Sequence, residues 1–241
     1  MPDTRTHRGS HPEDREQFAE CYLTSLQTAA RELGWLLDRG YALRSSLALV
    51  GNRHGLTQRQ RLALARSACS NAQQSRRRAH QLNSGALNGR ELWIDGYNLL
   101  ISLEAALAGG VILLGRDGCY RDMASLHGTY REVSETVVAA KLIGQSTQNW
   151  GIANCRWYLD RPVGNSGKLK SLLHEIAEAS GWNWQVELEF SPDHVLSQAP
   201  EVVVTSDSMV LDRCNVWFNA AREIITASVA GAVVIDLSGG S

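Results

Sequence analysis

Four aspartates in the second half of this chain are the residues best placed to do chemistry, because each comes at or just after the end of a predicted β-strand. The carboxyl ends of parallel strands meet at one edge of an open α/β sheet, where such sheets present their ligands. Hard divalent cations prefer oxygen ligands. We therefore predict a catalytic site in which one or two Mg²⁺ or Mn²⁺ ions are held by Asp95, Asp160, Asp193 and Asp207.

Each aspartate taken alone also has a simpler interpretation, as a turn or helix-capping residue. Asp95 ends the stretch 91–95, for example, at the point where a helix begins. Four carboxylates that converge without a cation repel one another, which raises the pKa of at least one of them. A bound metal relieves that repulsion and activates a water molecule. Four aspartates at successive strand ends favour the shared metal site.

The elements that must position these aspartates alternate along the chain from residue 91 onward. Short β-rich stretches are separated by stretches in which apolar residues recur at helical spacing. This alternation predicts an α/β fold with a mostly parallel sheet flanked by helices on both faces. The predicted strands are 91–95, 111–114, 155–159, 184–190, 201–205, 214–218 and 232–237, and the predicted helices are 98–108, 129–143, 168–180 and 219–230.

The first part of the chain shows helical spacing and no strand pattern. One helix starts near Pro12 and stops before Gly40, and a second covers 42–50. Thr57 begins a third with a capping-box pattern, and this helix runs towards Arg78. Residues 81–90 are polar and contain glycine, as in a domain linker. The sequence predicts a small all-α domain at 1–85, followed by an α/β domain at 90–241.

The charge of the chain is divided unevenly between these two parts. Residues 1–90 carry 14 arginines, no lysine and 7 acidic residues, a net charge of +7. Residues 91–241 carry 10 basic and 18 acidic residues, a net charge of −8. This asymmetry suggests that one part attracts a polyanion and the other holds a cation. The alternative is that the two halves neutralise each other across an interface.

The composition indicates a cytoplasmic protein without a membrane partner. No apolar run approaches the roughly 20 residues of a membrane-spanning helix, and the first residues lack an apolar signal region. Five scattered cysteines without a Cys-x-x-Cys pair read as thiols in a reducing compartment. The oligomeric state is left open.

An insert at 109–131 carries two candidate phosphate contacts, Arg116 and Arg131. Arginine grips phosphate with a planar fork of donors. The insert is therefore either a phosphate-contacting loop over the metal site or a salt-bridged surface hairpin, and both interpretations stay open.

Two further segments are candidates for binding a nucleic-acid backbone. The loop 161–168 is not a nucleotide-binding P-loop, since Pro162 stands where the first glycine belongs, but its free amides offer a place for one phosphate. The arginine run near residue 77 belongs to the basic half. The residues of these two segments that we expect to contact nucleic acid are Asn165 and Ser166, and Arg76, Arg77 and Arg78.

Two motifs resemble a known class of nucleases. Ile-Asp-Gly-Tyr-Asn-Leu-Leu at 94–100 resembles the opening motif of the NYN branch of PIN-like ribonucleases, and Val-Val-Thr-Ser-Asp-Ser at 203–208 resembles the motif that closes their active site. The resemblance implies a PIN-like sheet, an RNA substrate, and supporting roles for Asn98, Thr205 and Ser206 beside the metal ligands. The whole chain also resembles a family in which a DUF434 domain precedes a DUF5616 domain, and the stretch 49–62 carries that likeness.

These observations predict a metal-dependent ribonuclease that hydrolyses RNA phosphodiester bonds. One alternative is a nucleic-acid-binding protein that keeps the fold without catalysis, although a pure binder gains nothing from carboxylates that repel phosphate. The other alternative is a small-molecule phosphatase or nucleotide-binding enzyme, which has no need of an extended basic surface.

Overall fold

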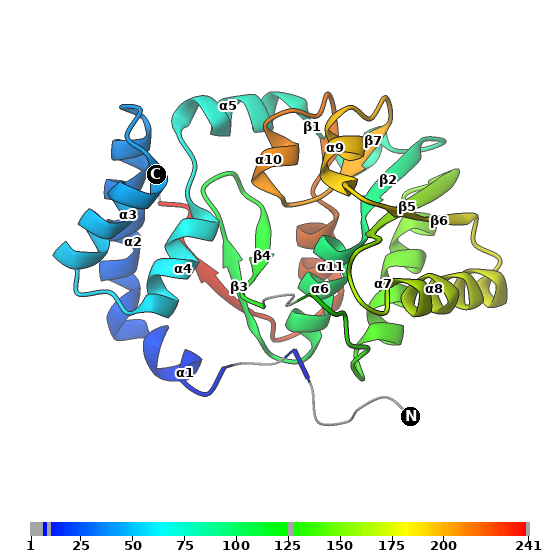
Figure 1. Ribbon diagram of the computed structural model, residues 1–241, viewed down its shortest axis with the longest axis horizontal. Coiled ribbons are helices and arrows are strands. Elements are labelled where there is room, and N and C mark those ends of the chain that lie inside the picture. Colours follow the sequence, from blue (N-terminus) through cyan, green and yellow to red (C-terminus); the bar gives the residue numbers. More distant parts are fainter. Residues whose placement is uncertain (1–6, 9–10, 125–127, 240–241) are drawn as a thin grey trace.

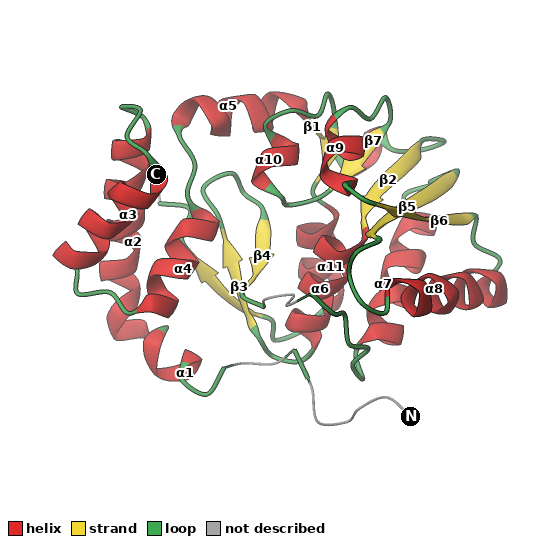
Figure 2. Cartoon of the chain, viewed as in Figure 1, coloured by secondary structure: helices red, strands yellow, loops and turns green. Residues whose placement is uncertain are grey.

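Two sheets and the helices around them make up the computed structural model of this protein, which describes residues 7–8, 11–124 and 128–239 (Figure 1). The larger sheet has six strands and the smaller has three. Most helices of the N-terminal part lie beside the smaller sheet, and the larger sheet lies at the other end of the molecule (Figure 2). The predicted fold class, a mostly parallel sheet flanked by helices after an N-terminal helical region, is confirmed.

All strand pairs of the larger sheet are parallel. Its spatial order is β1-β8-β7-β2-β5-β6, so β2 lies in the middle although it comes early in the chain. The strands are β1 (Gln81–Leu82), β2 (Glu91–Asp95), β5 (Asn154–Asp160), β6 (Trp184–Glu189), β7 (Val202–Val204) and β8 (Trp217–Phe218).

Successive side chains of the central strands enter two separate apolar layers, because side chains alternate across a sheet. Ile94 and Trp157 lie in one layer, and Trp93 and Tyr158 lie in the other. The first layer is covered by α6 (Gly96–Leu107), α7 (Thr136–Asn149), α8 (Ser166–Ser180) and α11 (Ala220–Ser228), and the second by the short helices α9 (Pro192–Ser197) and α10 (Ser208–Leu211). Both faces of the larger sheet are therefore covered.

The smaller sheet shares one apolar cluster with the N-terminal helices. Its order is β4-β3-β9, with strands β3 (Val111–Leu114), β4 (Tyr120–Asp122) and β9 (Val233–Asp236). Leu26 and Leu64 of the N-terminal helices pack in one cluster with Leu113 and Ile235 of this sheet. The N-terminal elements are α1 (Asp14–Gln17), α2 (Glu20–Leu37), α3 (Leu43–Arg53), α4 (Gln58–Ser67), α5 (Asn71–His80) and the 3-10 turn η1 (Ser84–Ala86). The sequence changes texture near residue 85, but the apolar core does not divide there.

The connections of the larger sheet reverse direction between β2 and β7. From β2 the chain continues to β5 and β6 on one side, and it then returns to β7 and β8 on the other side. In open α/β sheets such a reversal leaves a crevice at the carboxyl ends of the two strands, and ligands bind there. Asp95 is the last residue of β2, and Asp207 comes three positions after the end of β7. The topology therefore brings these two aspartates to one edge.

The predicted strands and helices all overlap observed ones, with two main differences. The predicted helix from Thr57 to Arg78 is in fact two helices, because Ala68 is extended (ψ 143°) and Ser70 starts α5 with its own capping box to Gln73. The helix predicted at 129–143 begins only at Thr136. Strand β4 and helices α9 and α10 have no predicted counterpart, and Gln81–Leu82 of the predicted linker 81–90 form strand β1 and pair with β8. Within the described residues, no helix combines the length and apolar character needed to cross a bilayer.

Candidate functional site

Asp95 is the centre of the candidate site. It is only 7% exposed, and it caps the N-terminus of α6 by accepting a hydrogen bond from the Asn98 backbone amide at 3.4 Å. Its other oxygen, Oδ2, accepts a bond from the Thr205 hydroxyl at 2.8 Å. Gly96 allows the helix to start here, since a Cβ at this position would lie 3.0 Å from the Tyr158 carbonyl oxygen.

The pKa of Asp95 is raised to about 7. Burial is the main cause, and the negative charges of Asp193 and Asp207 act in the same direction. The hydrogen bonds from Thr205 and Asn98 oppose the rise without cancelling it. A carboxyl group in this state gains from a nearby cation, because a positive charge offsets both the burial and the repulsion.

The loop after β7 is bonded directly to the start of α6. The Asn98 side-chain oxygen Oδ1 accepts hydrogen bonds from the Ser206 amide at 2.8 Å and from the Ser206 hydroxyl at 2.9 Å. The Asp207 amide donates to the Thr205 hydroxyl at 3.0 Å. One oxygen of Asp207, Oδ1, caps α10 at the Met209 amide (2.8 Å), which leaves Oδ2 without a hydrogen bond among the described residues. Asn98, Thr205 and Ser206 thus connect the two aspartates.

A pocket of about 480 Å³ opens over these residues. Asp95, Asp193 and Asp207 line it together. Tyr97 is part of the same lining, and its hydroxyl is buried without a hydrogen bond of normal geometry in the described part of the chain. Such a lining, rich in oxygen donors, suits a hydrated divalent cation.

Asp193 and Asp160 occupy different positions from Asp95. Asp193 lies in the first turn of α9 and faces the pocket, and its pKa is raised by burial and by Asp207 and Asp160. Asp160 ends β5 beside Glu189 of β6 and is not part of the pocket lining. Burial raises the pKa of Asp160. Three of the four predicted ligands therefore share a pocket, and the fourth lies outside it.

No three His, Cys, Asp or Glu side chains in residues 7–8, 11–124 and 128–239 are close enough together to hold one metal ion as direct ligands. The predicted set of four direct ligands is therefore not assembled. Mg²⁺ commonly takes only one or two carboxylates and keeps several waters. Asp95 with Asp207 or Asp193 satisfies that smaller requirement.

Arg66 and Arg121 form a positively charged wall of the same pocket. The Arg66 guanidinium is 29% exposed and donates to the carbonyl oxygens of Asp122 (2.6 Å) and Ala124 (2.8 Å). Asp122 contacts this guanidinium at 3.5 Å and also accepts a bond from Ser102 at 2.9 Å. Arg66 was not among the predicted site residues, since nothing local in the sequence distinguishes it from the other arginines of the basic half.

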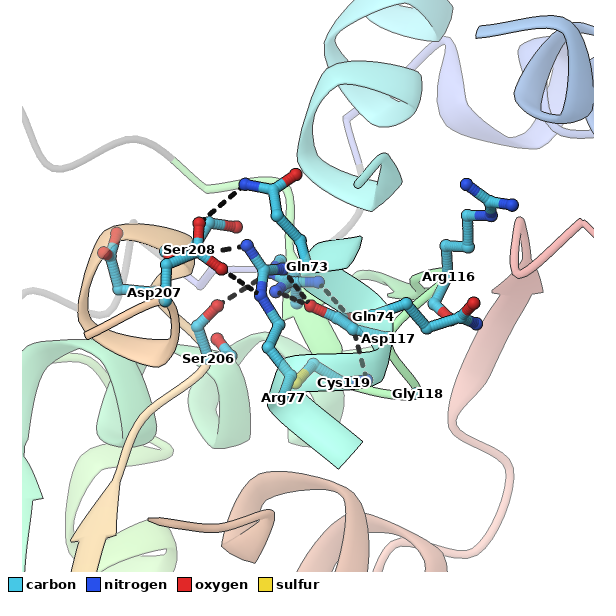
Figure 3. Close-up of polar contacts among 12 residues, drawn as sticks. Gln73, Gln74, Arg77, Arg116, Asp117, Gly118, Cys119, Ser206, Asp207 and Ser208 are labelled. Atoms are coloured by element: carbon cyan, nitrogen blue, oxygen red, sulfur yellow. Dashed lines mark hydrogen bonds and ion pairs between the residues drawn. The ribbon is translucent and has the colours of Figure 1, made fainter. Parts of the chain in front are cut away.

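At Arg116, the insert 109–131 does not form a loop over the aspartates of the pocket. Arg116 donates to the Cys69 carbonyl (2.8 Å) and to Asn71 (2.7 Å). Figure 3 shows its side chain far from Asp207, at the opposite end of the contact network. The β3–β4 hairpin carries an ion pair between Asp117 and Arg121, but this pair is buried, whereas the alternative interpretation expected a salt-bridged hairpin at the surface. Residues 125–127 of the insert lie outside the described residues.

The other predicted phosphate contacts are not in the pocket. Arg131 is exposed, and Arg8 donates to its carbonyl at 3.0 Å. Asn165 has a left-handed backbone conformation (φ 69°), and its side-chain amide donates to the Tyr130 carbonyl at 2.9 Å. Ser166 is buried at the start of α8. None of the three lines the pocket that holds Asp95.

The arginine run on α5 divides into buried and exposed residues. Arg76 and Arg78 are exposed. Arg77 is 1% exposed, and its guanidinium bonds to Asp117 at 2.5 Å and to Asp212 at 2.8 Å. The prediction that Arg77 contacts nucleic acid is therefore wrong, because a guanidinium buried between two carboxylates is out of reach of a polyanion.

The fold and the pocket define this chain as an α/β protein with an acidic site at the switch point of a parallel sheet. Residues 84–223 match the family described as "Domain of unknown function (DUF5616)", and residues 25–80 match "Protein of unknown function (DUF434)". The chain belongs to the DUF5616 family and carries a DUF434 segment before that domain, which confirms the resemblance drawn from residues 49–62.

The chain is also 31% identical over 196 residues to "Uncharacterized protein MJ0935" of Methanocaldococcus jannaschii. The alignment covers 80% of this chain and 92% of that protein, so both the helical and the α/β parts are shared. No solved structure matches the chain.

Proposed function

We propose that this protein is a metal-dependent phosphodiesterase that acts on RNA. The observation that carries the proposal is the buried carboxyl of Asp95 at the switch point, with its pKa raised to about 7 beside Asp193 and Asp207. A structural capping aspartate has no need of two acidic neighbours. A buried carboxyl beside two more accessible aspartates is typical of a site that functions with a bound cation.

Asp95, Asp207 and Asp193 are the residues that would hold Mg²⁺ or Mn²⁺. When bound, such an ion activates a water molecule and polarises a phosphoryl oxygen. Asn98 and Thr205 keep the two strand ends at a constant separation through their bonds to Ser206 and Asp95. Asp160 lies outside the pocket and contributes negative potential, as its effect on the pKa of Asp193 indicates.

Arg66 adds a role that the carboxylates lack. It brings a positive charge to the wall of a pocket lined by four aspartates, Asp95, Asp122, Asp193 and Asp207, and its contacts with the described residues leave donors of the guanidinium unused. A phosphate group between a bound cation and Arg66 would have its charge balanced from two sides. Exposed Arg76 and Arg78 are the proposed contacts for the backbone outside the pocket.

The resemblance of residues 94–100 and 203–208 to PIN-like ribonucleases supports RNA as the substrate. The two motifs lie at the ends of adjacent strands and are bonded to each other through Asn98 and Ser206. A protein that only binds nucleic acid would not benefit from four aspartates in one pocket, since carboxylates repel phosphate.

A phosphatase or nucleotide hydrolase with a small substrate is the second candidate. The pocket volume of about 480 Å³ favours it, because sites for small molecules have about 300–1,000 Å³. Several arginines of the basic half also form internal contacts, such as Arg59 with Asp14 and Arg77 with Asp117. The exposed basic surface is thus smaller than the charge count suggests, which weakens the argument against a small substrate.

The deciding experiment compares substrates and metals in one panel. The purified chain is incubated with single-stranded RNA, single-stranded DNA, nucleoside triphosphates and a chromogenic phosphate monoester, with Mn²⁺, Mg²⁺ or chelator. We expect RNA cleavage with Mn²⁺ and none with chelator. Selective turnover of the small substrates would favour the second candidate, and tight RNA binding without turnover would overturn both.

Matched variants show whether the activity belongs to this pocket. Asp95→Asn and Asp207→Asn each remove one negative charge from the site while keeping the side-chain shape. Asp236→Asn makes the same change on β9, outside the pocket. We expect a loss of about 100-fold or more in kcat for the first two variants and none for the third. Equal activity in all three would mean that cleavage arises elsewhere.

A further inference from the structure

Arg77 is a buried arginine of the DUF434 segment that reaches the loop carrying Asp207. Its Nη2 donates to the carbonyl oxygen of Ser208 at 3.3 Å, and its Nε donates to Asp212 at 2.8 Å, just beyond α10 (Figure 3). Arg77 belongs to α5. The Trp217 indole links the backbone of this helix to the larger sheet by donating to the Arg77 carbonyl at 2.7 Å. A single side chain thus links the helical part to the residue after Asp207.

Asp117 connects Arg77 to a second arginine. Its Oδ2 accepts hydrogen bonds from Arg77 at 2.5 Å and from Arg121 at 2.6 Å, and its Oδ1 accepts from Arg121 at 2.9 Å. The side chain is 1% exposed. Burial alone would raise the pKa of this carboxyl, but the guanidiniums of Arg121 and Arg77 hold it well below its usual range. Asp117 is therefore charged, and each arginine keeps the other in place through it.

Arg121 reaches the other side of Asp207. Its Nε donates to the carbonyl oxygen of Ser206 at 2.8 Å. The two carbonyls that flank Asp207, those of Ser206 and Ser208, are thus held by two arginines that share one carboxylate. One hydrogen bond on each side of Asp207 restricts the rotation of its two flanking peptide groups. The direction of the Asp207 side chain therefore depends on this network.

We propose that Arg77 is a positioning residue of the acidic site, and that the DUF434 segment completes that site by fixing, through Arg77, Asp117 and Arg121, the loop that carries Asp207. The inference rests on the proposed function in so far as Asp207 binds a cation. It gives the helical segment a task besides binding nucleic acid. The DUF5616 domain without this segment would have an incomplete site.

The test uses the full-length chain with Arg77→Lys. Lysine keeps the positive charge but lacks the planar fork that serves Asp117, Asp212 and Ser208 together. The matched control is Arg61→Lys, because Arg61 also holds a backbone carbonyl, that of Leu56, and its hydrogen bonds among the described residues all stay within the N-terminal part. Backbone amide exchange is measured without metal by mass spectrometry, in peptides that cover 205–211 and, as a reference, 169–180. Mn²⁺ affinity is measured by titration calorimetry.

We expect Arg77→Lys to speed exchange in 205–211 by about tenfold or more without affecting 169–180, since the loop opens locally. We expect its Mn²⁺ affinity to fall by about 10- to 100-fold, the usual effect of losing a residue that orients a metal ligand. Arg61→Lys should change neither quantity. Should Arg77→Lys fail to fold, Asp212→Asn, which removes one partner of Arg77 at the surface, should produce a smaller shift in the same direction.

Equal acceleration of exchange in both peptides would overturn the proposal, because Arg77 would then support only overall stability. Unchanged Mn²⁺ affinity in a folded Arg77→Lys protein would overturn it as well. A wild-type chain that binds no Mn²⁺ would instead contradict the proposed function, and the exchange in 205–211 would still decide whether Arg77 positions the loop.

Discussion

The Thr205 hydroxyl donates a hydrogen bond of 2.8 Å to Oδ2 of Asp95, and so joins the ends of β7 and β2 across 110 positions of the chain. Its oxygen also accepts a bond from the Asp207 amide at 3.0 Å. Thr205 is therefore the one side chain bonded to both the first and the last aspartate of the candidate site among the described residues. Because its hydroxyl donates to the ionised carboxylate, it lowers the pKa of Asp95 against the effect of burial.

Replacing Thr205 with Val should raise the pKa of Asp95 further, because valine has the same shape without the donor. The pH midpoint of Mn²⁺ binding should then move upward, since a cation competes with the proton on Asp95. The measurement is the Mn²⁺ dissociation constant between pH 5.5 and 8.5. Thr28→Val, at a half-buried position of α2, is the control. A midpoint that stays where it is in wild type would contradict the role given to Thr205.

The raised pKa of Asp95 also predicts how stability depends on pH without metal. The folded state holds its proton up to about pH 7, whereas the unfolded chain releases it near 3.8, so the folded state binds more protons between these values. The contribution of Asp95 to the free energy of unfolding therefore falls as pH rises from about 4 to 7, at up to about 1.4 kcal/mol per pH unit. Above pH 7 the folded state bears the whole free-energy cost of keeping the ionised Asp95 carboxylate buried.

Asp95→Asn should consequently stabilise the metal-free protein at pH 8 while abolishing its response to Mn²⁺. A gain of about 1 kcal/mol corresponds to about 2–4 °C in Tm for a chain of this size. Thermal unfolding at pH 5 and pH 8, with chelator and with Mn²⁺, measures both effects. A variant less stable than wild type at pH 8 with chelator would show that Asp95 carries no such cost.

Arg66→Gln should weaken the binding of a phosphate-bearing substrate by removing positive charge from the pocket wall. We expect KM to rise by about tenfold with a smaller change in kcat, which corresponds to about 1.4 kcal/mol of ground-state binding. Arg66→Lys should have a smaller effect, since it keeps the charge. Arg61→Gln is the control for the loss of an arginine that holds backbone carbonyls. An unchanged KM in Arg66→Gln would leave Arg66 with a structural role only.

The exposed arginines of α5 provide a separate test of nucleic-acid binding. Deleting residues 1–85 is unsuitable, because it would expose the core shared by Leu64, Leu113 and Ile235. Arg76→Ala combined with Arg78→Ala should instead lower the salt dependence of RNA binding, by about 0.7 in log–log slope for each phosphate that the protein no longer neutralises. Lys141→Ala, a single charge change on α7, is the control. A slope unaffected by the double variant would place the RNA path elsewhere.

The elements of this protein could be predicted from its sequence because local physics specifies them. Alternating apolar residues such as Trp93 and Ile94 must enter opposite faces of a sheet, and an aspartate followed by glycine at the end of a strand can start a helix, as Asp95 and Gly96 do. The break at Ala68 was also encoded, by the capping box of Ser70 and Gln73, and the sequence analysis overlooked it.

Only the tertiary structure decided which strand ends are neighbours. The order in the sheet makes both β7 and β5 neighbours of β2. Asp207, after β7, shares a pocket with Asp95 and Asp193, whereas Asp160 lies two residues beyond Tyr158, the β5 residue paired with Asp95, and is outside that pocket. The order of strands in the sheet depends on the way in which the long crossover connections pack, and no local sequence pattern specifies it.

The same limit applies to the arginines of α5. Arg77 and Arg78 have the same side chain and adjacent positions, yet one is buried between carboxylates and the other is exposed. Successive residues of a helix point about 100° apart, and the local sequence does not say which direction faces a partner. That choice is made by Asp117 and Asp212, which folding brings to α5 from 40 and 135 positions away. The sequence alone determined the charges, and the packing of distant elements determined which of them belong to the site.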